Sequence, residues 1–305
     1  MHEVLIVGGG PAGMTAAVYV GRKKLDAALV SRDLGGQALW SLDIENYMGY
    51  QYITGQELMD KFRQQMEQFP VEQHVGEDVF RLTAVDVGFT VETRQGTSYQ
   101  ARTVIIATGK RPRPLDVPGE KELIGRGVSY CATCDGPLFR DLEVAVVGGG
   151  ASAMAAAVDL AKVARTVHLI HSGSRWLTTP ALKDTALGFE NVRPLLSHTV
   201  TAVRGDGQVS GITVKSAQGE ERHLALQGVF VETGLIPSSE CVADLVQLNA
   251  QREIVVDCDA KTSRAGIYAA GDVTSVPAKQ IVVAAGEGAK AALSAHAFLL
   301  RARKG

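Results

Sequence analysis

The sequence predicts an α/β protein of two domains, each built around a strand, a glycine-rich turn and a helix. Residues 7–18 (VGGGPAGMTAAV) align without a gap with residues 147–158 (VGGGASAMAAAV), 140 residues further along the chain. Each stretch follows a continuous apolar run, which is typical of a buried parallel strand, and continues into an alanine-rich helix and a second strand. A chain of 305 residues is also long enough for two domains with separate cores.

Both turns have the spacing of a dinucleotide-binding fingerprint, G-x-G-x-x-G in the first copy and G-x-G-x-x-A in the second. The first glycine permits the sharp turn, the second lets the backbone approach a pyrophosphate, and the third small residue lets the helix pack on the strand. The helix N-terminus then offers free N–H groups and a partial positive charge to the phosphates. We therefore expect two Rossmann-like, three-layer ββα nucleotide-binding domains.

Composition places the domain boundaries. Residues 110–114 (KRPRP) form a stiff, proline-rich linker after a buried strand. A strand and turn at 266–273 and an alanine-rich helix at 280–300 then follow near the end of the chain. We therefore expect the first domain to be discontinuous. The expected domains are 1–112 with 243–305, which carries the first turn, and 113–242, which carries the second turn and the cysteine pair described next.

The bulk composition narrows the class of protein. A net charge of −2 and a pI near 6.4 give no indication of nucleic-acid binding. The longest apolar stretch, residues 144–164, is interrupted by glycines and by Asp159 and Lys162, so we expect no membrane span. Because the first strand begins right after Glu3, and four cysteines are too few for a secreted disulfide framework, we expect a cytoplasmic protein without a targeting segment.

Two cysteines three residues apart carry a specific chemical signal. Cys131 and Cys134 in C-A-T-C are close enough to form a disulfide, and one thiol can attack a partner while the other resolves the mixed disulfide. Asp135, next in the chain, is a candidate general acid or base. The alternative is half of a zinc site. It is disfavoured because Cys241 and Cys258 lie 17 residues apart, and we expect both to be buried apolar residues.

These motifs together resemble the low-molecular-weight thioredoxin reductases, and the resemblance covers nearly the whole chain in order. A redox pair inside the second nucleotide-binding domain is more diagnostic than any single glycine motif. The matching segments are 8–13 (GGGPAG), 35–37 (GGQ), 44–47 (IENY), 107–109 (ATG), 131–136 (CATCDG), 148–153 (GGGASA) and 271–273 (GDV), together with Gln280.

The resemblance implies FAD in the first domain, residues 1–112 with 243–305, with its pyrophosphate on the first glycine turn and its ribityl or phosphate region bonded to Asp272. The implied FAD-binding residues are Gly8, Gly10, Pro11, Ala12, Gly13, Gly35, Gly36, Gln37, Asn46, Ala107, Thr108, Gly109, Gly271, Asp272, Lys279, Gln280 and Ile281.

The resemblance also implies the roles of the redox residues and the assembly. Cys134 would be the sulfur nearer the flavin, Cys131 would attack the partner disulfide, and Asp135 would donate the proton. Family members are homodimers whose second domain rotates so that either the disulfide or the nicotinamide meets the flavin. The linkers near 112 and 242 are where that hinge would lie.

The second domain lacks the cationic residues that grip the 2′-phosphate of NADPH in such relatives. Ser172 and Gly173 occupy the positions of their arginine pair and Leu177 that of a third arginine, while Arg175 is out of register. A charge-assisted hydrogen bond is worth about 1.5–3 kcal/mol, so losing two costs about 3–6 kcal/mol, or roughly a hundredfold to ten-thousandfold in affinity. We therefore expect NADPH to be a poor donor.

Other donors stay open. An acidic residue at the end of the second strand marks an NADH site, and here His171 either bonds a ribose hydroxyl or merely ends the strand. Because the glycine turn survives, NADH or a second dinucleotide, even a second FAD, is compatible with it. Some members of the wider family use reduced ferredoxin and show similar losses. The candidate residues of this second cradle are Gly148, Gly150, Ser152, Ala153 and His171.

The leading hypothesis is an FAD enzyme that reduces thioredoxin or a thioredoxin-like protein through Cys131 and Cys134, with ferredoxin or another donor in place of NADPH. One alternative is an NADH- or NADPH-dependent thioredoxin reductase. Another is a non-catalytic, nucleotide-sensing flavoprotein. The cysteine pair with Asp135 counts against that alternative, because a sensor needs no resolving thiol beside a proton donor.

Overall fold

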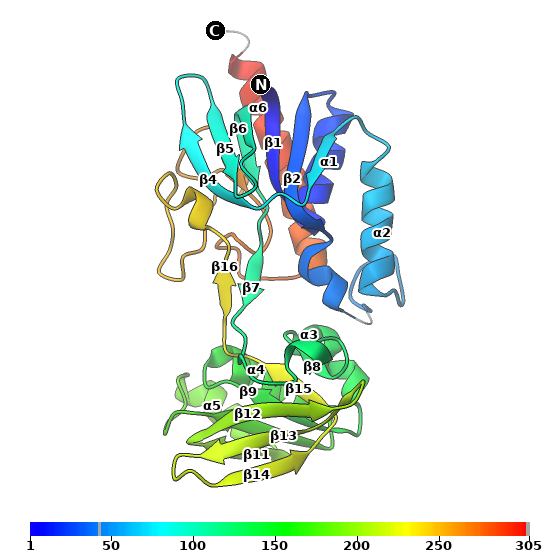
Figure 1. Cartoon of the computed structure of the whole chain (residues 1–305), viewed down its shortest axis with the longest axis vertical. Helices are drawn as coiled ribbons and strands as arrows, with labels where there is room; N and C mark the ends of the chain where they lie inside the picture. The colour runs from blue at the N-terminus through cyan, green and yellow to red at the C-terminus, as the bar shows by residue number, and fades with distance from the viewer. Residues whose placement is uncertain (42–43, 303–305) are drawn as a thin grey trace. The chain divides into compact units, whose positions relative to one another are not determined.

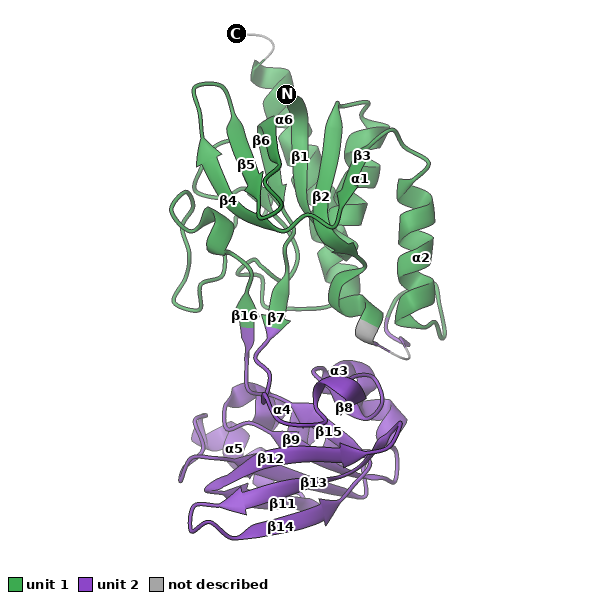
Figure 2. Ribbon diagram, viewed as in Figure 1, with its two compact units in different colours: residues 1–39, 47–111, 236–305 green, residues 40–46, 112–235 purple. Residues whose placement is uncertain are grey.

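The computed structural model describes residues 1–41 and 44–302, which form two compact α/β units (Figure 1, Figure 2). Unit 1 comprises residues 1–39, 47–111 and 236–305, and unit 2 comprises residues 40–46 and 112–235. Each unit has parallel strands flanked by helices and by antiparallel strands, which confirms the predicted fold class. Within the described residues, no helix has the length and hydropathy needed to cross a membrane.

Unit 1 is built on a mixed sheet in the order β3-β2-β1-β6-β5-β4, with β17 also paired to β6. The pairs among β1, β2, β3, β6 and β17 are parallel, whereas β4 and β5 add an antiparallel edge. Its strands are β1 (His2–Gly9), β2 (Ala27–Leu34), β3 (Glu72–Val75), β4 (Val79–Ala84), β5 (Phe89–Thr93), β6 (Ser98–Ile106) and β17 (Ile267–Ala269). Its helices are α1 (Pro11–Arg22), α2 (Gly55–Met66) and α6 (Ile281–Ala302), with 3₁₀ turns at Gly36–Trp40 and Glu240–Val242.

Unit 2 contains a parallel sheet in the order β11-β10-β9-β15-β8 and an antiparallel sheet in the order β12-β13-β14. Its strands are β8 (Val128–Ser129), β9 (Glu143–Val147), β10 (Thr166–His171), β11 (Val192–Leu196), β12 (His198–Gly205), β13 (Val209–Ser216), β14 (Glu221–Ala225) and β15 (Gly228–Val231). Its helices are α3 (Ala132–Asp135), α4 (Ala151–Ala161) and α5 (Pro180–Leu187), with 3₁₀ turns at Lys121–Leu123 and Gly136–Phe139.

Alternate side chains of the parallel strands in unit 2 enter two different cores. Val144 and Val146 of β9 pack with Leu160 and the other apolar residues of α4. Ala145 and Val147 of the same strand pack with residues of the antiparallel sheet such as Ile212. The continuous apolar run of β9 is therefore explained by burial on both faces, and unit 2 has the expected three-layer ββα order.

The second connection between the units lies earlier in the sequence than we expected. The connecting strands β7 (Lys110–Pro112) and β16 (Leu235–Pro237) pair with each other, and the chain enters unit 1 again at Ile236 rather than near 243. The reason is apolar burial, because Cys241 and Val242 lie in the core of unit 1. The compact units thus divide the chain at residue 236, whereas composition predicted a boundary near 243.

Two helices of unit 1 pack unusually closely. A Cβ added at Gly288 in α6 would overlap the carbonyl oxygen of Ala12 in α1. Only glycine permits this approach, and it holds α6 against the helix that follows the first glycine turn. Gly286, two residues earlier in α6, is exposed, and no described atom lies within 4 Å of a Cβ added there.

Gly288→Ala tests this packing. Alanine favours helices over glycine by about 1 kcal/mol, but its Cβ would force α1 and α6 apart. We expect the free energy of unfolding to fall by about 1–3 kcal/mol, measured by urea denaturation. Gly286→Ala is the matched control and should be neutral or stabilising. Equal stability of the two variants would contradict the packing argument.

Candidate active site

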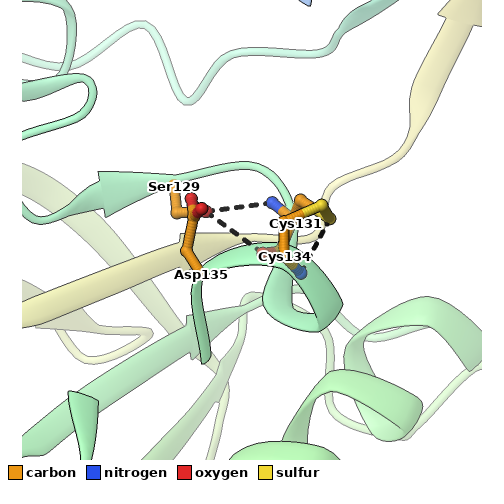
Figure 3. Close-up of a disulfide and its surroundings, with 4 residues drawn as sticks. All are labelled: Ser129, Cys131, Cys134 and Asp135. Carbon is orange, nitrogen blue, oxygen red and sulfur yellow. Dashed lines mark hydrogen bonds between the residues drawn. A yellow bond between two sulfur atoms is a disulfide. The ribbon is translucent and has the colours of Figure 1, made fainter. Parts of the chain in front are cut away.

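The redox pair lies directly after an edge strand of unit 2. Cys131 and Cys134 form a disulfide, with 5.3 Å between their Cα atoms (Figure 3). Cys131 precedes the first residue of α3 in an extended conformation, and its Sγ accepts a hydrogen bond of 3.2 Å from the backbone N–H of Cys134. The C-A-T-C spacing therefore forms one helical turn that brings the two sulfurs together, as the sequence predicted.

A hydroxyl joins the disulfide to the neighbouring carboxylate. Ser129 Oγ donates a hydrogen bond of 2.6 Å to Asp135 Oδ2 and accepts one of 3.0 Å from the backbone N–H of Cys131 (Figure 3). The backbone N–H of Asp135 also donates to the carbonyl of Cys131, at 3.1 Å. The structure thus brings Cys131, Cys134 and Asp135 together, and it adds Ser129 to them.

The first glycine turn is shaped by contacts with the chain's own backbone. Gly8 has a φ of +112°, and a Cβ there would overlap the carbonyl of Ala107. A Cβ at Gly13 would overlap the carbonyl of Gly8. At Gly10, by contrast, no described atom lies within 4 Å of an added Cβ, and no side chain caps the start of α1. The turn thus leaves an open, N–H-rich face, which fits a pyrophosphate.

Other predicted FAD-binding segments gather at this turn. The backbone N–H of Gly35 donates to the carbonyl of Gly9 at 2.8 Å, and a Cβ at Gly36 would lie 3.6 Å from the Cα of Gly10. The N–H of Ala107 donates to Val7 at the end of β1. Asn46 differs from these residues because it belongs to unit 2, whereas the other predicted FAD-binding residues belong to unit 1.

The Gly271–Asp272 turn is held by a buried acid. Glu287 Oε2 in α6 accepts a hydrogen bond of 2.7 Å from the backbone N–H of Gly271, which has a φ of +78°. Burial raises the pKa of the Asp272 carboxyl, although the charges of Lys279 and Lys110 oppose this shift. The contact from α6 therefore fixes the turn that presents Asp272.

Lys110, Glu253, Asp272 and Lys279 form what we call the buried charge cluster of unit 1. Lys110 Nζ lies 2.6 Å from Glu253 Oε1, and Lys279 Nζ lies 3.5 Å from the same oxygen. Gln37 Nε2 donates to the carbonyl of Lys110 at 2.6 Å. Burial raises the pKa of Glu253, but hydrogen bonds from Lys110 and Asn249 outweigh it and the pKa lies below its ordinary value. Gln37 and Lys279, which we predicted to line the FAD site, thus belong to one network of hydrogen bonds and ion pairs with Lys110 and Glu253.

The second glycine turn is covered by the end of β10. A Cβ at Gly149 would overlap the imidazole of His171, which stacks on Trp176 with 5.7 Å between ring centroids. The N–H of Leu177 donates to the carbonyl of Gly149 at 2.7 Å. No described atom lies within 4 Å of a Cβ added at Gly150. His171 therefore packs against the turn, while the start of α4 stays open.

The two cysteines outside the redox pair differ from each other. Cys241 is buried, and burial raises the pKa of its thiol to about 12, as expected for an apolar packing residue. Cys258 is exposed, so the prediction that it is buried is wrong. It lies in a turn where Asp257 accepts hydrogen bonds from the N–H groups of Asp259 and Lys261, which turns the chain at the surface.

A redox disulfide and a nucleotide-binding turn in one chain define a nucleotide-dependent disulfide oxidoreductase. The chain belongs to the pyridine nucleotide-disulphide oxidoreductase family, whose sequence profile matches residues 2–288. FAD is the cofactor expected for this family, and the open turn at Gly10 fits its pyrophosphate.

Two solved structures with this fold are thioredoxin reductases. The enzyme from Streptococcus pyogenes MGAS5005 has a TM-score of 0.93 at 38% sequence identity, over 99% of both chains. The enzyme from Giardia duodenalis has a TM-score of 0.90 at 30% identity, over 98% of this chain and 99% of that one. The chain thus has the fold of the thioredoxin reductases.

Curated relatives are longer than this chain. The F subunit of the alkyl hydroperoxide reductase of Pseudomonas putida is 42% identical over 303 residues, which cover 98% of this chain and 58% of the relative. Its counterpart in Escherichia coli (strain K12) is 39% identical over 307 residues, covering 99% and 59%. The chain therefore spans less than three fifths of the length of these relatives.

Sequence reasoning did not select several residues that the structure places at these sites. Ser129 stands two positions before Cys131, and Lys110 directly follows the 107–109 motif, so proximity to a motif was the available signal. Glu287 interrupts an alanine-rich helix, which is also a signal. Glu253 and Glu232 lie in no motif, and only the fold brings them to the sites.

Glu253→Gln tests the buried charge cluster through its pH dependence. Because the folded protein holds the pKa of Glu253 below its ordinary value of 4.5, the carboxylate adds stability above that pH and loses it as the pH falls. We expect the variant to be less stable than the parent by about 3 kcal/mol at pH 7, measured by thermal unfolding. The difference should begin to shrink below pH 4.5 and should disappear only as the pH falls through the lowered pKa of Glu253 in the folded protein.

Glu67→Gln is the control for this comparison. Its ion pair with Arg63 is exposed, at 3.9 Å, so its loss should change stability little at any pH. A stability difference for Glu253→Gln that stays constant from pH 7 down to about pH 2 would refute the electrostatic explanation.

Proposed function

We propose that this enzyme passes electrons from an external donor, through FAD bound in unit 1 and the Cys131–Cys134 disulfide, to the disulfide of a thioredoxin-like protein. FAD supplies the two-electron chemistry when bound. Two electrons and two protons convert the Cys131–Cys134 disulfide into two thiols. Dithiol–disulfide exchange then transfers the two electrons and two protons to the partner, and the Cys131–Cys134 disulfide forms again. The observation that carries the proposal is the formed disulfide with Asp135 joined to it through Ser129.

Within this scheme the redox residues have separate roles. Cys131 attacks the partner disulfide and Cys134 resolves the mixed disulfide, as in the family that the motifs resemble. Asp135 supplies and accepts the proton, since its carboxylate shares a hydroxyl with the backbone of Cys131. The residues around the first glycine turn, including Asp272 and Lys279, hold FAD.

We propose a separate protein as the acceptor. The thioredoxin reductase of Streptococcus pyogenes matches this chain with a TM-score of 0.93, and its name favours thioredoxin or a thioredoxin-like protein as the partner. The names of the longer relatives favour a peroxide-reducing protein as the final acceptor of these electrons. We also propose a homodimer, as in the family that the motifs resemble.

We further propose that the donor is not NADPH, with reduced ferredoxin as the leading candidate. Residues 171–178 contain one cation, Arg175, and its side chain is exposed. Leu177 stands where a phosphate-binding arginine would be and is 62% exposed, so no charge is offered to a 2′-phosphate there. The imidazole of His171 packs on Gly149 and so leaves less of the turn accessible.

NADH is the second candidate, and one observation favours it. The start of α4 has no side-chain cap, and Gly150 faces open space among the described residues, so a pyrophosphate without a 2′-phosphate is still compatible with the turn. A second bound dinucleotide would use the same face. A non-catalytic sensor is disfavoured, because it needs neither the disulfide nor Asp135.

Anaerobic reduction identifies the donor. We expect reduced ferredoxin to bleach the visible flavin absorption quickly, and NADPH at micromolar concentration to do so slowly. Fast bleaching by micromolar NADPH would contradict the proposal, and fast bleaching by NADH alone would favour the second candidate. Bleaching by every donor without new thiols, counted with a thiol reagent, would favour the sensor.

Arginines placed at the lost positions provide a matched gain of function. Ser172→Arg with Leu177→Arg should lower the NADPH concentration for half-maximal bleaching by about 100-fold or more, because each charge-assisted hydrogen bond is worth about 1.5–3 kcal/mol. Ser174→Arg with Ala181→Arg adds the same two charges at exposed positions out of register and is the control. An equal gain from the control would mean that general charge, not a phosphate site, is responsible.

Asp135→Asn tests the proton donor. We expect it to slow reduction of a thioredoxin disulfide by the prereduced enzyme by about 10²–10⁴-fold, measured by stopped flow, and Ser129→Ala to slow it less. Asp141→Asn is the control, since Asp141 is exposed and its φ of +59° suits asparagine. A normal exchange rate in Asp135→Asn would remove Asp135 from the mechanism.

A further inference from the structure

Glu232 lies where the ends of two parallel strands of unit 2 meet. It follows β15, and its backbone N–H donates a hydrogen bond of 2.8 Å to the carbonyl of Val147, the last residue of β9. A Cβ at Gly148 would overlap the carbonyl oxygen of Glu232. The glycine turn therefore fixes the backbone of Glu232 at the edge of the sheet that also bears the redox pair.

The half-buried side chain of Glu232 reaches the redox segment. Phe230 of β15 pairs with Ser129 of β8, so Glu232 and Cys131 each stand two residues beyond the same pair at the ends of neighbouring parallel strands. The backbone N–H of Ala132, between the two cysteines, and the hydroxyl of Ser152 at the start of α4 both favour the ionised form of the Glu232 carboxyl. Burial raises the pKa of Glu232 to about 6, although both partners favour the ionised form. At neutral pH a negative charge thus lies beside the disulfide.

Among the described residues, α4, β9 and β15 offer no cation to offset that charge. The cation of the neighbouring segment is Arg113, whose backbone bonds to Thr233 and Gly234 and whose side chain is exposed. Residues 151–158 at the start of α4 and the strand β15 contain no charged side chain. In β9 the charged residue is Glu143, at the opposite end, where it pairs with Arg165. The titratable groups of the α3 segment are Cys131, Cys134 and Asp135.

We propose that Glu232 is a positioning residue for the redox pair, whose carboxylate holds the Ala132 backbone and whose charge disfavours the thiolates that form on reduction. The proposal rests on the proposed function only in taking Cys131 and Cys134 as the reactive pair. A like charge disfavours ionisation of a neighbouring group, and the thiolate is the nucleophile in exchange. Glu232 therefore helps to set the pH at which the reduced pair reacts.

The test is the pH profile of thiol alkylation, which needs neither an electron donor nor a partner protein. The full-length flavoprotein is reduced with dithiothreitol, desalted anaerobically and treated with iodoacetamide between pH 5 and 9. Trypsin cleaves after Arg126 and Arg140, so mass spectrometry follows both cysteines on one peptide, residues 127–140. Failure to reduce thioredoxin would defeat the proposed function and leave this measurement intact.

Glu232→Gln keeps the size and an acceptor oxygen but removes the charge. We expect the midpoint of its alkylation profile to fall by about 0.5–1 pH unit. Glu232→Asp retains the charge and should keep the midpoint of the parent, and Glu190→Gln, an exposed glutamate of unit 2, should do the same. These two variants separate the effect of charge from that of any change in folding.

Two outcomes would overturn the proposal. One is an unchanged or raised midpoint in Glu232→Gln, because then the carboxylate charge does not disfavour the thiolate. The other is an equal fall in Glu232→Gln and Glu232→Asp, because a change in packing rather than charge would then be responsible. Thermal unfolding of each variant confirms that folded protein is being compared.

Discussion

The structure depends on backbone approaches that leave no room for a Cβ. In unit 1, Gly8 and Gly13 bring the end of β1, the start of α1 and the segment after β6 into direct contact. Gly288 lets α6 pack against the same region, because it allows the close approach of α6 to the carbonyl of Ala12 at the start of α1. Because α6 carries Glu287, which holds the Gly271 turn, the position of Asp272 follows from these contacts. Close contacts between main-chain segments thus fix the positions of the proposed FAD-binding residues.

A backbone approach without room for a Cβ also shapes unit 2, where it brings the ends of parallel strands together. Parallel strands end on one edge of a sheet, and functional residues of such folds gather there. The end of β8 supplies Ser129 and the redox pair, while the end of β15 supplies Glu232. The tight turn at Gly148 draws the end of β15 to that of β9. Glu232 therefore reaches the redox segment because of sheet topology, whereas Asp135 directly follows Cys134 in the sequence.

This difference explains what the sequence could predict. The glycine turns and the disulfide are local, so the repeat at 8–13 and 148–153 and the C-A-T-C motif were sufficient to predict them. Lys110 and Glu253 are 143 residues apart, and no periodic pattern relates them. Composition also gave no signal that Cys241 packs in the core of unit 1, since it is buried by strands far away in the sequence.

The glycines of the second turn have a structural explanation that does not require a ligand. A side chain at position 148 would overlap the carbonyl of Glu232, so glycine is needed there. A side chain at position 149 would overlap the imidazole of His171, so glycine is needed there too. Both would be retained in a protein that had lost its pyridine nucleotide. Gly150 differs, since no described atom lies within 4 Å of a Cβ added there. Gly150 and the uncapped start of α4 are therefore the features that favour a bound dinucleotide at this turn. The other two glycines are explained by packing alone.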